Sequence, residues 1–96
     1  MMLPVTGMSD GLGSVSLYPN PASANMSVRI NGEKEGTVKI SILNQLGIKV
    51  DEYYDEKKGP ELVKEIPVTG LAHGLYYILI TLDNEVIFSN QAIISR

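Results

Sequence analysis

Apolar and polar side chains alternate in the segment Val38-Lys39-Ile40-Ser41-Ile42. This period of two places the aliphatic side chains on one face of a β-strand and the polar side chains on the other. A strand with one apolar face is typical of an antiparallel sheet that covers a core on one side and meets water on the other. We therefore expect a second layer of structure to cover the apolar face.

Turn-forming residues separate this segment from similar runs on both sides. Gly47 in Asn44-Gln45-Leu46-Gly47 can adopt a positive φ, and Asp83-Asn84 predicts a second tight turn. No segment of the sequence keeps a helical period over the length of a helix. The runs predicted as strands are residues 15–18, 26–30, 38–42, 48–54, 62–67, 75–82 and 86–95. This spacing predicts an all-β domain, an immunoglobulin-like antiparallel β-sandwich of about seven strands, and leaves a barrel as the alternative.

Length and composition fit one domain preceded by a linker. The 96 residues suffice for a single domain, and no part of the sequence argues for a second. Glycine and serine recur in residues 1–14, which we expect to be a flexible linker, and the sandwich is expected to span residues 15–96. Within the sandwich, residues 55–60 are expected to form a charged loop and residues 68–74 a corner.

The charge balance argues against nucleic acid and anionic membranes as partners. Eight Lys and Arg against eleven Asp and Glu give a net charge of −3 and leave no basic stripe. No apolar run approaches the ~20 residues of a membrane-spanning helix, so direct membrane insertion is not expected. The sequence contains no cysteine, which excludes disulfides, thiolate catalysis and thiolate metal sites.

The residues that could carry chemistry are few and poorly placed. His73 is the single histidine, and the sequence sets no nucleophile and buried acid beside it. The carboxylates between positions 51 and 56 could suit calcium, but no Asp-x-Asp-x-Asp-Gly loop is present and Lys57-Lys58 balances their charge, so a solvated loop is the preferred interpretation. Tyr53 and Tyr54 could join a sugar-stacking platform, but neighbours in a strand face opposite sides. We therefore predict no enzymatic activity, no metal and no cofactor.

The predicted strand at residues 75–82 is apolar on both faces. Tyr76, Ile78 and Ile80 share one face, and a sandwich strand needs only that face buried. The opposite face carries Leu75, Tyr77 and Leu79. Two interpretations remain open for this second face. It is covered by a loop or by the N-terminal linker, or it is an exposed strip on which a partner domain docks.

Three motifs occur in order along the chain. The first is Leu17-Tyr18-Pro19-Asn20-Pro21-Ala22, in which the two prolines end the first strand. The second is the strand, turn and strand of residues 38–50 around Gly47. In the third, at residues 71–80, Gly74 frees the backbone, and Tyr76 is expected to fill the sandwich with its ring while its hydroxyl reaches a carbonyl of the corner.

These motifs and the apolar end of the chain resemble, over residues 17–96, the C-terminal sorting domains of the type IX (Por) secretion system of Bacteroidetes. The resemblance implies a domain that does no chemistry and is recognised by the outer-membrane secretion machinery. It implies a parent protein with an upstream cargo domain that passes through the periplasm and is secreted or reaches the cell surface. It also implies a surface sortase of cysteine-protease type that cuts in the linker, by position within residues 5–15.

Recognition by the secretion machinery is predicted at the apolar end of the chain. An apolar terminal strand offers backbone edge groups and side chains with which another protein could pair. The predicted residues are Ala92, Ile93, Ile94, Ser95 and Arg96. The alternative function is an immunoglobulin-like adhesion or carbohydrate-binding accessory module of a surface protein. The two functions differ because a sorting signal depends on the last few residues of the chain, whereas an adhesion module does not.

Overall fold

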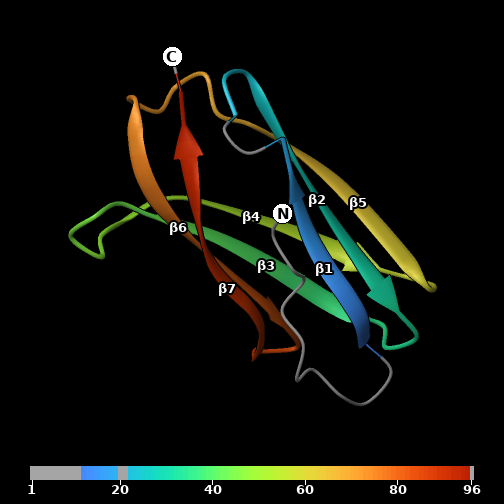
Figure 1. Cartoon of the computed structure of the whole chain (residues 1–96). Helices are drawn as coiled ribbons and strands as arrows, with labels where there is room; N and C mark the ends of the chain where they lie inside the picture. Colours follow the sequence, from blue (N-terminus) through green and yellow to red (C-terminus); the bar gives the residue numbers. More distant parts are fainter. Residues whose placement is uncertain (1–11, 20–21, 96) are drawn as a thin grey trace.

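The computed structural model describes residues 12–19 and 22–95, and these residues form two antiparallel sheets packed face to face (Figure 1). The strands are β1 (Leu12–Tyr18), β2 (Asn25–Gly32), β3 (Gly36–Leu43), β4 (Lys49–Lys57), β5 (Glu61–Pro67), β6 (Gly74–Leu82) and β7 (Glu85–Ile94). The smaller sheet has the order β1-β2-β5 and the larger sheet the order β4-β3-β6-β7. The prediction of an all-β, immunoglobulin-like sandwich of seven strands is confirmed, and two separate sheets replace the barrel alternative.

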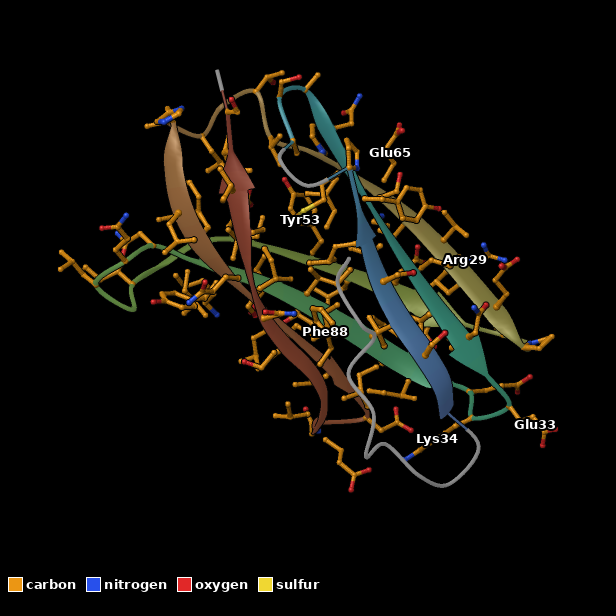
Figure 2. All side chains as sticks on the ribbon, in the orientation of Figure 1. Arg29, Glu33, Lys34, Tyr53, Glu65 and Phe88 are labelled. Atoms are coloured by element: carbon orange, nitrogen blue, oxygen red, sulfur yellow. The ribbon has the colours of Figure 1, made fainter. Side chains whose placement is uncertain are left out.

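The core lies between the sheets and is built from the alternate residues that the sequence marked as apolar. Val38, Ile40 and Ile42 of β3 are at most 1% exposed, and full burial of such a side chain stabilises the fold by about 1.5–3 kcal/mol. Figure 2 shows Tyr53 and Phe88 directed between the sheets. The buried apolar residues are Val15, Leu17, Ala22, Met26, Val28, Ile30, Val38, Ile40, Ile42, Ile66, Val68, Tyr76, Ile78, Ile80, Leu82, Ile87, Phe88, Ala92 and Ile94.

The first strand begins earlier than predicted. It was expected to start at Val15, but β1 begins at Leu12, because Leu12 pairs with Gly32 and Ser14 with Asn31 across an irregularity in the register. Residues 12–14 therefore belong to the sheet and not to the linker. The rest of the predicted linker, residues 1–11, lies outside the described residues, so that part of the domain boundary stays a prediction.

The two predicted tight turns are present. In the turn between β3 and β4, Gly47 has a φ of 81°, and the side-chain oxygen of Asn44 accepts bonds from the backbone N–H groups of Leu46 (2.9 Å) and Ile48 (3.1 Å). In the turn between β6 and β7, Asp83 and Asn84 both have positive φ, at 50° and 68°. Positive φ at both central residues is the geometry of a two-residue hairpin that matches the strand twist.

The turn between β6 and β7 is also fixed to the start of β3. The Asp83 carboxylate accepts the backbone N–H of Thr37 at 2.9 Å, and the Asp83 backbone N–H donates to the Thr37 carbonyl at 2.9 Å. A Cβ at Gly36 would lie 2.5 Å from the Asp83 carboxylate oxygens, and the φ of Gly36 is +155°. Only glycine permits the Asp83 carboxylate to come this close. The missing side chain at Gly36 therefore allows the turn between β6 and β7 to bond the start of β3, which is far away in the sequence.

The predicted charged loop at residues 55–60 is wrong in its first half. Strand β4 continues to Lys57, which pairs with Gly36 and is 1% exposed. Its ammonium group donates to the carbonyls of Gly32 (2.5 Å), Lys34 (2.9 Å) and Gly59 (2.6 Å). The sequence suggested a solvated lysine because lysine is almost never fully buried unless it is paired. Here its three donors meet three carbonyls, and the side chain ties the β2–β3 connection to the β4–β5 connection.

We predict that Lys57→Met destabilises the domain by about 2–4 kcal/mol, because methionine fills the space of the stem but leaves three carbonyls without their donor. The free energy of unfolding in urea measures this loss. Lys58→Met is the matched control, since Lys58 is exposed and its replacement is expected to change stability by less than about 0.5 kcal/mol. Equal stabilities of the two variants would contradict the role of Lys57.

Candidate recognition surface

The residues predicted to be recognised lie at the end of β7, and their side chains alternate between core and solvent. Ala92 and Ile94 are each 1% exposed and pack in the core. Ile93 is 45% exposed, and Ser95 is also exposed. Arg96 lies outside the described residues. Among the described members of this set, Ile93 and Ser95 are therefore the residues that present side chains to a partner.

The end of β7 is bonded along both of its edges. On one edge, Ala92, Ile93 and Ile94 pair with Tyr76, Leu75 and Gly74 of β6. On the other edge, Ala22 forms a parallel bridge: its N–H donates to the Ile93 carbonyl at 2.9 Å, and its carbonyl accepts the Ser95 N–H at 2.8 Å. The expectation that the tail offers its backbone edge to a partner needs correction here, because these edge groups are already bonded.

This bridge gives the first motif a structural role. Leu17 and Tyr18 end β1, Pro19 follows, and the chain returns at Ala22, which is 1% exposed. Asn20 and Pro21 lie outside the described residues. The motif thus leads the chain from the smaller sheet to the edge of β7 that faces away from β6, where Ala22 bonds the tail.

The third motif is a packing corner, as predicted. Tyr76 is 8% exposed, and its hydroxyl donates to the Ala72 carbonyl at 2.7 Å. Gly74 has a φ of +156° at the first position of β6. A shallow hollow opens where this corner meets the turn that contains Gly47. Its lining residues are Asn44, Gln45, Leu46, His73, Gly74, Leu75 and Tyr76.

The predicted docking residues lie on the outer face of the larger sheet and continue onto β7. Leu75 and Leu79 are half-buried, and Tyr77 is 37% exposed. Leu75 lies directly opposite Ile93. Tyr77 lies opposite Leu43 of β3. We call the surface formed by Leu43, Leu75, Tyr77, Leu79 and Ile93 the outer strip. The structure thus brings together two sets of residues, the docking strip and the chain end, that the sequence suggested separately.

The turn between β3 and β4 extends this apolar surface in a way that the sequence did not indicate. Leu46 is 82% exposed, and Ile48 and Val50 are also exposed. Residues 48–54 are predicted as a strand, and β4 begins at Lys49. A register shift after the Ile42–Asp51 pair lets Leu43 pair with Lys49, so this end of β4 follows the edge of the sheet instead of covering the core.

The charged residues of β4 pair with their neighbours. Glu52 bonds Lys49 at 2.7 Å, and this bond is the main reason that the pKa of the Glu52 carboxyl is lowered and that of Lys49 is raised. Asp51 accepts a bond from the Tyr53 hydroxyl at 2.7 Å.

Residues 12–19 and 22–95 hold no group of three or more His, Asp or Glu arranged to bind a metal ion. The same residues contain no helix of the length and apolar character needed to cross a membrane.

The two adjacent tyrosines do not form a platform for sugar stacking. Tyr53 packs against the core, whereas Tyr54 is 59% exposed on the other face of β4. The prediction that one of them belongs to the core is confirmed. The pKa of Tyr53 is raised to about 12, first by burial and then by its bond to Asp51.

A family model matches almost the whole sandwich. The family is described as "Secretion system C-terminal sorting domain", and the match covers residues 16–95. It includes the first motif, the outer strip and the end of β7. No curated protein matches the chain.

We predict that the domain loses stability more steeply than its Tyr53→Phe variant between pH 10 and about 12. An unfolded tyrosine titrates near ~10, so a higher folded pKa means that the stabilisation is complete below pH ~10 and is lost as pH rises through the folded pKa. Urea unfolding of both proteins at several pH values tests this. Parallel losses of stability in the two proteins would show that Tyr53 does not control alkaline unfolding.

Proposed function

Because the chain belongs to the family of secretion system C-terminal sorting domains, we propose that it is a non-enzymatic signal that the type IX secretion machinery recognises in order to carry the parent protein across the outer membrane. The family implies export to the cell surface or secretion. We propose further that the route passes through the periplasm and that the partner is the outer-membrane part of the machinery.

The observation that carries this proposal is that the end of the chain and the outer strip form one surface. Ile93 stands opposite Leu75 on the outer face, and Tyr77 follows on the same face of β6. Exposed apolar side chains such as Ile93 and Tyr77, joined by half-buried ones, mark a surface for a protein partner. Tyrosine supplies a large and rigid contact area and is enriched where interfaces bind most strongly. We propose that the secretion machinery covers this surface.

The five predicted recognition residues divide into two roles. Ile93 and Ser95 are proposed to contact the machinery through their side chains, because both side chains are exposed. Ala92 and Ile94 are proposed to act indirectly, since their burial holds the strand in the register that exposes Ile93. The part of Arg96 in recognition stays a proposal from the family resemblance alone.

Deleting residues 93–96 would not separate recognition from folding. The deletion removes Ile94 from the core and removes the Ile93 carbonyl and Ser95 N–H that bond Ala22. Loss of export by such a truncated protein would fit either cause. A single exposed residue is the sharper test.

We also propose that a surface sortase removes the sandwich from an upstream cargo domain. The position expected for the cut lay within residues 5–15. Strand β1 occupies residues 12–15 of that range, and Val15 is fully buried. A protease needs an accessible extended segment, so the proposal narrows to residues 5–11.

We predict that Ile93→Gln lowers export of a reporter that carries residues 1–96 at its C-terminus in a Bacteroidetes cell with an active type IX system. Replacing an exposed apolar contact with an amide is expected to cost ~1–2 kcal/mol of binding, which corresponds to about 5–30-fold in affinity. The amount of reporter at the cell surface relative to the periplasm is the measurement.

Val63→Gln is the matched control for this experiment. Val63 is 51% exposed on β5, in the smaller sheet and away from the outer strip. Export of this variant should equal that of the unmodified reporter, and circular dichroism of the two purified variants should show that both fold. Full export of Ile93→Gln, or an equal loss in both variants, would overturn the proposed recognition surface.

A further inference from the structure

We propose that side-chain caps disfavour strand addition at both edges of the larger sheet, so that a partner instead reads side chains on its face. The caps are Asp51 and Asp55 on β4 and Asn90 on β7. The closure of the edges stands on the hydrogen bonds of the domain itself. Its consequence for the secretion machinery rests on the proposed function.

On β4, two aspartates occupy the backbone donors of the edge. Asp51 Oδ1 accepts the N–H of Glu52 at 2.9 Å, and Asp55 Oδ1 accepts the N–H of Glu56 at 2.8 Å. Successive residues of an antiparallel edge strand point their backbone groups alternately toward the neighbouring strand and away from it. Glu52 and Glu56 are four residues apart, so their backbone groups point to the same side of β4. Because both N–H groups bond side chains, that side is the one that faces away from β3.

Each aspartate is held in its capping position by its second oxygen. Asp51 Oδ2 accepts the Tyr53 hydroxyl at 2.7 Å. Asp55 Oδ2 pairs with Lys64 of β5 at 3.8 Å. One oxygen of each carboxylate therefore closes the edge while the other fixes the orientation of the group.

On β7, the same device recurs beside the bridge to Ala22. Asn90 Oδ1 accepts the N–H of Gln91 at 2.8 Å. The backbone groups of Gln91 point to the same side of β7 as those of Ile93 and Ser95, which bond Ala22. Consecutive outward positions at the end of β7 are thus bonded within the domain, on the strand that carries the candidate recognition residues.

The caps act against an incoming strand in two ways. A strand that adds to an edge needs the N–H groups that point outward, and at these positions the caps already occupy them. The carboxylates of Asp51 and Asp55 would also face the carbonyl oxygens of the incoming strand, and like partial charges repel. Capped edges disfavour pairing between two copies of the domain and so favour a monomer. They also favour recognition by the machinery through the outer strip.

The first experiment compares two variants of equal charge. Asp51→Ala/Asp55→Ala/Asn90→Ala removes all three caps, whereas Asp51→Asn/Asp55→Asn keeps a capping oxygen at each position. Both variants lose two negative charges and change the net charge from −3 to −1. Any difference between them therefore reports the caps and not the charge.

Light scattering after gel filtration, over a range of protein concentrations, gives the association state of each purified full chain. We expect the unmodified protein and the Asn variant to be monomers and the Ala variant to associate at a concentration at least ~10-fold lower, because uncapped edges pair. A folded Ala variant that stays as monomeric as the Asn variant would overturn the inference. So would an Asn variant that associates as readily as the Ala variant.

If the triple variant does not fold, the single variant Asn90→Ala keeps the inference testable, with Asn90→Asp as its control because aspartate retains the capping oxygen. Association of the alanine variant alone supports the cap on β7, and equal behaviour of the two contradicts it.

The second experiment asks how the machinery reads the domain. Gln91→Pro removes an edge N–H that points away from β6, and proline is tolerated at such edge positions. In the export reporter, we expect this variant to reach the surface as the unmodified reporter does. Loss of export by a Gln91→Pro domain that still folds would show that the machinery adds a strand to β7. Failure of the unmodified reporter to be exported would instead contradict the proposed function and leave the association experiment unaffected.

Discussion

Two backbone hydrogen bonds, those that join Ala22 to Ile93 and Ser95, tie the first part of the domain to its last strand. They connect the segment after the first strand to the end of the last strand and so join the two sheets at one side of the sandwich (Figure 1). Together with the pairing of β7 with β6, they hold the tail in the register that buries Ile94 and turns Ile93 outward. The same contact therefore completes the core and sets the surface that we assign to recognition.

The proposed recognition surface exists only in the folded domain. Its residues come from β3, β6 and β7, and only strand pairing brings Leu43, Tyr77 and Ile93 onto one face. A partner that binds this face distinguishes the folded sandwich from an unfolded chain of the same sequence. Sorting by such a surface depends on conformation more than on a short linear motif.

Much of the fold could be predicted because its signals are local. The alternation at Val38–Ile42, the turn at Asp83-Asn84 and the tyrosine at the corner each concern residues that are close in the sequence. Pairings between distant residues left no such signal. The burial of Lys57 requires carbonyls from two remote connections, and the bridge from Ala22 to β7 joins opposite ends of the chain. The apolar residues on the outer face of β6 were therefore predictable from the sequence, because both faces of that strand are apolar. Their position beside Ile93 became clear only from the register in which β6 and β7 pair.

The position of β7 has a further consequence for the time order of folding. The strand that supplies Phe88, Ala92 and Ile94 to the core is the last of the seven strands to be synthesised and, in a chain threaded through a membrane from its N-terminus, the last of the seven to be delivered. Long-range pairing also makes all-β domains fold more slowly than helical ones. Until β7 arrives, β6 lacks one of its two partner strands and the N–H of Ala22 lacks its acceptor. The sandwich can therefore close only after its last strand has become available.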